Sequence, residues 1–268
     1  MILHSQKRSF GQGCNVSLFT LGTMRATENL DKMYSLIKNA HHSGINHLET
    51  AASYGNAEIL IGEALKKLEI KENIPRKKWI ITTKVLPKGD LNYLKNNFEI
   101  SLKNLKQNKI HNLAIHGINL DEHLDWVLNG NGKKFIKWLF RKGLVNQVGF
   151  SSHGSYSLIE KAINCDLFSF CNLHLHFFDQ SKMSLAQLAL KKNMGVLAIS
   201  PADKGGRLYS PSDILLKASA PYHPLEIAYR FLLSRGITTL SLGATKFEDF
   251  NIAKKLMNSS YNLTSPEI

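Results

Sequence analysis

Four polar side chains of this sequence, Glu49, Tyr54, Lys84 and His116, have types that together suit proton transfer. A tyrosine phenol has a reference pKa of about 10, which is high for a proton donor at neutral pH, and a nearby ammonium lowers it by favouring the phenolate. Lys84 can supply that charge, and Glu49 is the counter-ion that a buried Lys84 would need. His116 can orient a carbonyl oxygen toward Tyr54. The set therefore suits proton donation to a developing alkoxide, and any hydride must come from a reduced cofactor.

These four residues must be positioned by short apolar runs that alternate with segments of helical periodicity. The runs predict eight strands, over residues 16–21, 46–48, 80–85, 112–115, 147–150, 167–172, 196–199 and 239–242. Apolar spacing predicts helices between them, such as the one that starts at Leu30 and the one that follows a candidate N-cap at Asp90. Eight strands separated by helices favour a single (β/α)8 TIM barrel domain over residues 1–268. A doubly wound sheet is the alternative, and it is disfavoured because no GxGxxG fingerprint follows the first strand.

In such a barrel the loops after the strands build the active site, so polar residues at strand ends would converge on one mouth. Lys84 and His116 end the third and fourth expected strands, and Glu49 and Tyr54 follow the second. Further polar residues at strand ends are Ser151, Ser152 and Asn172.

The composition fits a globular protein, with 43% hydrophobic and 21% charged residues. The three cysteines form no CxxC pair, and the sequence shows no signal-like or membrane-spanning apolar stretch, so we expect a cytoplasmic protein that does not insert into a membrane. The formal net charge is +13, but the basic residues are dispersed, mostly lysine, and no nucleic-acid-binding motif accompanies them. We therefore expect no nucleic-acid partner.

The segment from Gly44 to Glu58, GINHLETAASYGNAE, resembles the signature of the aldo-keto reductases, a family of NADPH-dependent (β/α)8 carbonyl reductases. Further motifs resemble the family in the same order along nearly the whole chain, namely LGTM from Leu21, TK at Thr83, IH at Ile115, VGFSS from Val148 and ISP from Ile199. The Glu-Thr-Ala variant is most similar to a microbial subgroup that often carries a C-terminal iron–sulfur module. No cysteine follows Cys171, so we expect that module to be absent here.

The resemblance implies a catalytic tetrad with Tyr54 as general acid, Lys84 lowering its pKa, His116 orienting the substrate and Glu49 in the usual aspartate position. It also implies NADPH as cofactor, with NADH as the alternative, and a small carbonyl compound as substrate. The residues that would hold the cofactor by this resemblance are Gly22, Thr23, Ser151, Ser152, Asn172, Ser200, Lys204, Arg207, Thr245 and Lys246. Asp249 stands where relatives place an arginine for the 2′-phosphate, and Ile199 replaces an aromatic ring.

Two other functions stay open at this point. The departures around the cofactor are also expected of a barrel that binds a nucleotide with little turnover. His174 and His176 form an HxH on one strand face, with His116 and Glu49 as further candidates, which is a pattern of metal-dependent barrel hydrolases. A second histidine pair at the strand ends is missing, so the primary expectation includes no metal ligand.

Overall fold

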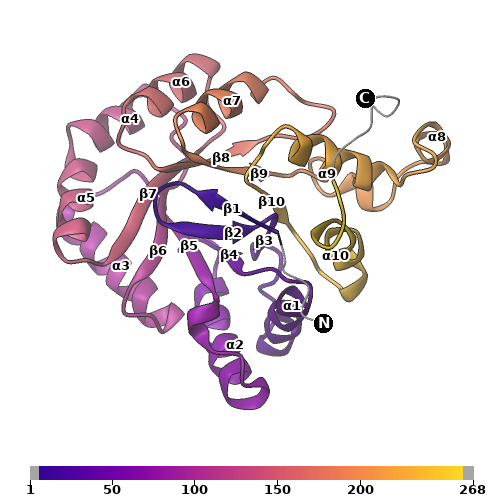
Figure 1. Cartoon of the computed structure of the whole chain (residues 1–268). Helices are drawn as coiled ribbons and strands as arrows, with labels where there is room; N and C mark the ends of the chain where they lie inside the picture. Colours follow the sequence, from indigo (N-terminus) through magenta and orange to yellow (C-terminus); the bar gives the residue numbers. More distant parts are fainter. Residues whose placement is uncertain (1–5, 262–268) are drawn as a thin grey trace.

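A computed structural model describes residues 6–261 and shows a closed barrel of eight parallel strands surrounded by helices (Figure 1). The strands follow one another around the barrel in chain order, and β10 closes the ring by pairing with β3. The barrel strands are β3 (Phe19–Gly22), β4 (His47–Glu49), β5 (Ile80–Val85), β6 (Ile110–Ile115), β7 (Val145–Ser152), β8 (Phe170–His174), β9 (Gly195–Ile199) and β10 (Thr239–Leu242). The expected (β/α)8 TIM barrel is confirmed.

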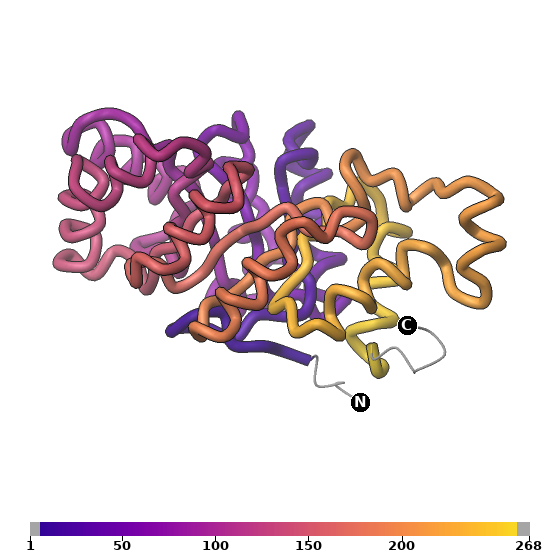
Figure 2. Tube along the Cα trace, turned by 90° about the horizontal axis from the view of Figure 1, so that it is seen from above, coloured from indigo at the N-terminus to yellow at the C-terminus, as the bar shows by residue number. Residues whose placement is uncertain are grey.

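Helices cover the outside of the barrel and connect its parallel strands. They are α1 (Leu30–His42), α2 (Ala57–Glu72), α3 (Leu91–Leu105), α4 (Asp121–Leu128), α5 (Asn131–Arg141), α6 (Tyr156–Asn164), α7 (Met183–Lys191), α8 (Asp213–Ala218), α9 (Pro224–Ser234) and α10 (Asn251–Met257), with short 3-10 turns η1 (Arg76–Lys78), η2 (Arg207–Tyr209) and η3 (Phe247–Phe250). The segment around α8 extends away from the barrel (Figure 2). The expected N-cap is confirmed, since the Asp90 carboxylate accepts from the Tyr93 amide at 2.8 Å.

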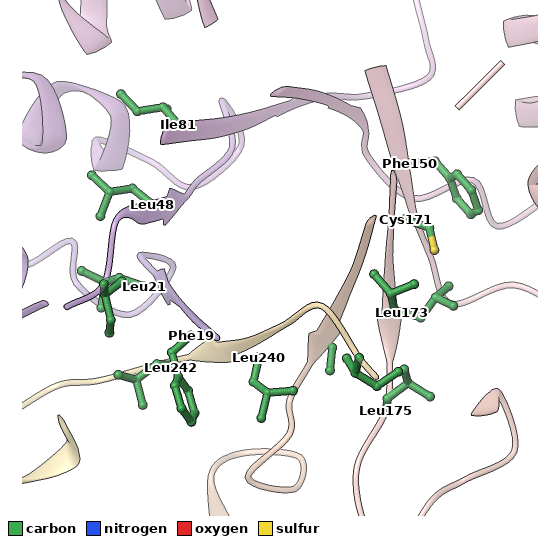
Figure 3. Close-up of a cluster of buried hydrophobic side chains, with 14 of the residues drawn as sticks. Phe19, Leu21, Leu48, Ile81, Phe150, Cys171, Leu173, Leu175, Leu240 and Leu242 are labelled. Carbon is green, nitrogen blue, oxygen red and sulfur yellow. The ribbon is translucent and has the colours of Figure 1, made fainter. Parts of the chain in front are cut away.

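The main apolar core lies between strands and helices rather than inside the barrel. Leu48, Ile81 and Phe150 are fully buried and point away from the barrel axis (Figure 3). The alternate strand residues point inward and include polar groups: His47 lies between the hydroxyls of Thr20 and Thr82, at 2.7 Å from each. Because successive side chains of a strand point to opposite faces, the barrel has an apolar outer layer and a hydrogen-bonded interior.

One expected strand was wrong. Residues 16–21 do not form a single strand, because β2 (Cys14–Ser17) ends before β3 begins and pairs antiparallel with β1 (Lys7–Phe10). This hairpin crosses the end of the barrel at which the strands begin (Figure 1). Its Phe10 ring packs on Phe170, with ring centroids 4.9 Å apart, and a Cβ at Gly195 would lie 2.4 Å from Phe10. The hairpin closes this end and leaves the opposite end for chemistry.

No helix within residues 6–261 is long and apolar enough to span a bilayer.

Candidate active site

The site begins at the carboxyl end of β4, where the chain turns sharply to present Tyr54. The Thr50 amide donates to Thr82 O at 2.9 Å and the Ala52 amide to Lys84 O at 3.3 Å, so the loop is pinned to β5. The Tyr54 amide closes a turn on Ala51 O at 3.0 Å. Because of these bonds the Tyr54 ring leans over the end of β5, where Lys84 projects into the barrel mouth.

Lys84 is buried, and its ammonium has a partner for each of its three protons. Its Nζ donates to Thr50 O at 2.8 Å and to Tyr54 Oη at 3.1 Å, and it pairs with Glu49 Oε1. An ammonium has three protons to donate, so these three acceptors satisfy it. Burial lowers the pKa of Lys84, and the carboxylate of Glu49 acts in the opposite direction. The ammonium is therefore held in one position, from which it donates a hydrogen bond to the phenol oxygen.

The electrostatics around Tyr54 differ from the expectation. Burial, followed by the negative charge of Glu49, raises the pKa of the Tyr54 phenol above its ordinary value. The expected lowering by Lys84 is not found, because Glu49 neutralises the field of that ammonium at close range. The phenol consequently carries its proton at neutral pH.

His116 lies beside Tyr54, at the end of β6. Its amide donates to Val85 O at 2.7 Å, and its ring stands edge-on to the phenol with the centroids 5.8 Å apart. Burial, then the charges of Lys84 and His153, lower the pKa of His116 to about 4. The imidazole is neutral at physiological pH, and its Nδ1 lies 3.2 Å from Ser53 Oγ.

Two clefts meet at Tyr54. The narrower one, of about 150 Å³, runs past Gly22, Glu49 and the loop that follows β9, from Ser200 to Gly206. The wider one, of about 680 Å³, passes His116 toward the loops after β5 and β7. Tyr54, Met24, Ile199 and Ser200 line both clefts. A group in the narrow cleft and a group in the wide cleft can therefore both reach the phenol.

The sequence model of the Aldo/keto reductase family matches residues 19–213, more than half of the chain. This chain belongs to the aldo/keto reductase family. It is an enzyme of the oxidoreductase type, as the resemblance of its motifs implies.

Solved structures agree with the fold of this aldo/keto reductase. Aldo-keto reductase AKR11C1 from Bacillus halodurans, in its holo form, is similar with a TM-score of 0.84 and 21% identity, over 98% of this chain and 94% of that one. An aldose reductase from Schistosoma japonicum gives a TM-score of 0.77 and 21% identity, over 98% and 89%. An aldo/keto reductase from Brucella melitensis gives 0.75 and 20%, over 98% and 96%. At these identities the likeness describes the fold.

The structure brings some of the expected cofactor residues to the site. Gly22 and Ser200 line the narrow cleft. Asn172 is buried behind Glu49, to which its Nδ2 donates at 3.3 Å, while its Oδ1 has no hydrogen-bond partner. Thr23 bonds to the backbone of Glu49, since its Oγ1 donates to the Glu49 carbonyl oxygen at 3.0 Å. Gly22 and Ser200 thus line the narrow cleft directly, and Asn172 and Thr23 lie behind Glu49, which lines it.

Other expected cofactor residues have different positions. The Ser151 hydroxyl accepts from the Gly117 amide at 3.0 Å, and Ser152 Oγ accepts from the Gly154 amide at 2.9 Å, so both support loops. Lys204 lines the wide cleft rather than the narrow one. Arg207 is exposed and lies 4.0 Å from Asp203.

The backbone amides of Thr245 and Lys246 are already bonded to a carboxylate of the chain itself. Asp249 Oδ2 accepts from the Thr245 amide at 2.8 Å, from the Thr245 hydroxyl at 3.2 Å and from the Lys246 amide at 3.1 Å. Asp249 is almost fully buried and caps the turn η3. Asp249, at the position where the resemblance places an arginine, therefore has a structural role: it caps this turn.

Sequence reasoning missed several contributors. Ser53 contacts the His116 ring, and the Thr50 carbonyl holds Lys84. Ser53 could have been suspected as a hydroxyl directly before Tyr54. A backbone carbonyl carries no residue-type signal, so Thr50 could be found only from the structure.

Proposed function

We propose that this aldo/keto reductase reduces an aldehyde or ketone to an alcohol with a nicotinamide cofactor, and that Tyr54 is the general acid. The contact between Lys84 Nζ and Tyr54 Oη, at the point where the two clefts meet, is the observation that carries the proposal. The substrate is a small carbonyl compound that enters through the wide cleft.

The residues present fit a nicotinamide cofactor in the narrow cleft. Asn172 lies behind Glu49, which lines this cleft, and its buried Oδ1 has no partner. An unpaired buried acceptor carries a desolvation cost, which a carboxamide donor would relieve. The loop after β9 contains left-handed residues, with φ of 54° at Ser200 and 65° at Asp203, and such strained backbone is typical of ligand-binding segments. Gly22, Ser200 and Asn172 would hold the cofactor. When bound, it supplies the hydride.

The residues of the chain supply and control the proton. Because the pKa of Tyr54 is raised, the phenol is present in the acid form that can protonate the carbonyl oxygen. As the proton leaves, the Lys84 hydrogen bond to Tyr54 Oη stabilises the phenolate that forms. Neutral His116 stands beside the phenol and can hydrogen-bond the same oxygen, which orients the carbonyl.

The kind of nicotinamide depends on the loop before η3. By resemblance Thr245 and Lys246 would bind a 2′-phosphate, with Lys204 and Arg207 as further positive charges. Asp249 occupies both amides and places a negative charge there. We therefore infer that NADH is accepted as well as NADPH.

Tyr54→Phe tests the proposed acid. We expect kcat/KM for aldehydes to fall about 10²- to 10⁴-fold, the usual contribution of a general acid, while nucleotide affinity changes less than about twofold. The assay follows oxidation of NADPH and NADH over a panel of aldehydes and ketones, with fluorescence titration for binding. Tyr156→Phe is the matched control, because its hydroxyl contacts only Ser184 on the exterior.

The same assay separates the alternatives. Equal turnover of wild type and Tyr54→Phe would refute the acid role. Nucleotide binding without turnover by the wild type would favour the non-catalytic barrel. A metal-dependent hydrolase is not supported, because Glu49 is paired with Lys84 and, within residues 6–261, neither Glu49 nor His116 joins the His174 cluster.

A further inference from the structure

A cluster outside the proposed proton-transfer set lies just beyond β8. His174 ends the strand and lines the wide cleft, and His176 and Asp179 follow it in the chain. One ligand atom from each of the three lies within 4.8 Å of the others, and His174 Nδ1 is 4.0 Å from Asp179 Oδ2. Two imidazoles and a carboxylate are a ligand set that zinc accepts.

The backbone that carries the cluster is held in place. The Leu175 amide donates to Ile199 O at 3.2 Å, which continues the pairing of β8 with β9. The Asp179 amide returns to His176 O at 3.1 Å and closes a tight turn. The Phe177 ring at the tip packs on Phe231, with the centroids 5.1 Å apart. The three side chains therefore need only rotate to reach a common point.

The carboxylate of Asp179 is already oriented. Its Oδ1 accepts from the Ser181 amide at 3.1 Å and from the Ser181 hydroxyl at 2.6 Å. Its Oδ2 is left facing the His174 ring. A ligand carboxylate whose second oxygen is fixed by hydrogen bonds is the usual arrangement at metal sites.

His176 supplies an independent indication of a ligand. It is 93% buried, and its Nδ1 is a buried nitrogen with no hydrogen-bond partner. Its other ring nitrogen, Nε2, lies 3.8 Å from Asp203 Oδ1. With the Nε2 proton directed toward that carboxylate, Nδ1 is the lone-pair donor, which is the tautomer that carboxylate–histidine–zinc triads use.

We propose that His174, His176 and Asp179 bind a divalent transition-metal ion of the zinc type. Ligand atoms of one tetrahedral zinc lie about 3.3 Å apart for bonds of about 2.0 Å, so rotations of the half-buried His174 and Asp179 toward the buried His176 would close the cluster. The fourth position is left for water at the cleft rim. This site is separate from the proposed proton-transfer set, and the proposal does not depend on the reductase function.

The neighbouring cation gives the proposal a distinctive consequence. The Lys182 charge acts on Asp179 and on the His174 ring, so it opposes a metal ion there. Removing that charge in Lys182→Met should tighten zinc binding several-fold. A role of the three residues in packing alone predicts no such change.

The experiment titrates the full chain, without nucleotide, with zinc chloride against a chromophoric chelator, and with cobalt(II) followed by visible absorption. We expect one saturable site with the absorption of tetrahedral cobalt. His176→Gln and Asp179→Asn should each weaken binding at least about 10-fold, the effect of losing even an outer partner. His123→Gln is the matched control, because His123 lines the same cleft but is bonded at Nδ1 to Gly117 O at 3.0 Å. Its affinity should stay within twofold.

Absence of saturable binding, or equal affinity in wild type, His176→Gln and Asp179→Asn, would overturn the proposal. Because His176 is buried, its variant can fail to fold, which circular dichroism would show. The half-buried positions Asp179 and Lys182 then decide the matter, since their variants must shift the affinity in opposite directions.

Discussion

At the residue scale, the proposed chemistry depends on a buried charge pair. Lys84 donates to three oxygens, and the pairing with Glu49 offsets the cost of placing an ammonium inside the barrel mouth. The Glu49 side chain, one methylene longer than the aspartate that the family resemblance implies, still reaches Nζ. Because burial, followed by the charge of Glu49, raises the pKa of Tyr54, the phenol that Lys84 holds keeps its proton.

Lys84→Met should remove activity and destabilise the fold. It leaves the Glu49 carboxylate buried without its counter-ion, and we expect a loss of about 3–5 kcal/mol in the free energy of unfolding. Urea unfolding at pH 7 measures it. The double variant Lys84→Met with Glu49→Leu should recover part of that stability and remain inactive. A cost below about 1 kcal/mol for the single variant would contradict the buried-pair interpretation.

At the element scale, η3 decides which groups stay available on the loop that we propose for the cofactor. A 3-10 turn leaves amides without partners at its start, and Asp249 satisfies two of them. In the same way, the hairpin of β1 and β2 occupies the barrel end opposite the site. The turn η3 thus occupies backbone amides of its loop, and the hairpin covers one end of the barrel, so the opposite end is left for the candidate site.

Asp249→Ala should shift cofactor preference toward NADPH. The change removes a negative charge and frees the Thr245 and Lys246 amides for a phosphate, and we expect the ratio of NADPH to NADH affinity to rise about 10-fold, which corresponds to about 1.4 kcal/mol. Fluorescence titration of both nucleotides measures the ratio. Glu248→Ala, on the exposed face of the same turn, is the control. An unchanged ratio in Asp249→Ala would show that Asp249 does not govern the phosphate.

At the scale of the whole molecule, the barrel interior links stability to pH. His47 is fully buried between Thr20 and Thr82, and burial, followed by the charges of His111 and Lys84, lowers its pKa from 6.5 to about 3. Between these values the unfolded chain binds a proton that the folded barrel does not. The contribution of His47 to stability is therefore complete above about pH 6.5 and is lost as the pH falls toward 3.

We expect the free energy of unfolding to decrease by up to about 1.4 kcal/mol per pH unit below pH 6 through His47 alone. Urea unfolding between pH 7 and pH 4.5 measures the slope. In His47→Gln the slope should be shallower by about one proton. An equal slope in the two proteins would mean that His47 is not the group that titrates.

Much of the site and the fold was predictable from local sequence. The bounds of β5 and β10 coincide with their apolar runs, and Asp90 was recognisable as an N-cap because capping is a local interaction. Glu49, Lys84 and His116 were expected at one mouth because parallel strands end on the same side of a barrel. The hairpin was missed, since residues 16–21 read as one apolar run while the chain turns at Leu18.

The alternation of strands and helices, the family signature and the residue types of the candidate site could all be read from the sequence. The direction of the Tyr54 pKa, the occupation of the Thr245 and Lys246 amides by Asp249, and the proximity of His174, His176 and Asp179 could be found only from the folded chain. The physical reason is that burial and the distances between charges depend on atoms from several segments. Residue type and spacing describe each segment alone.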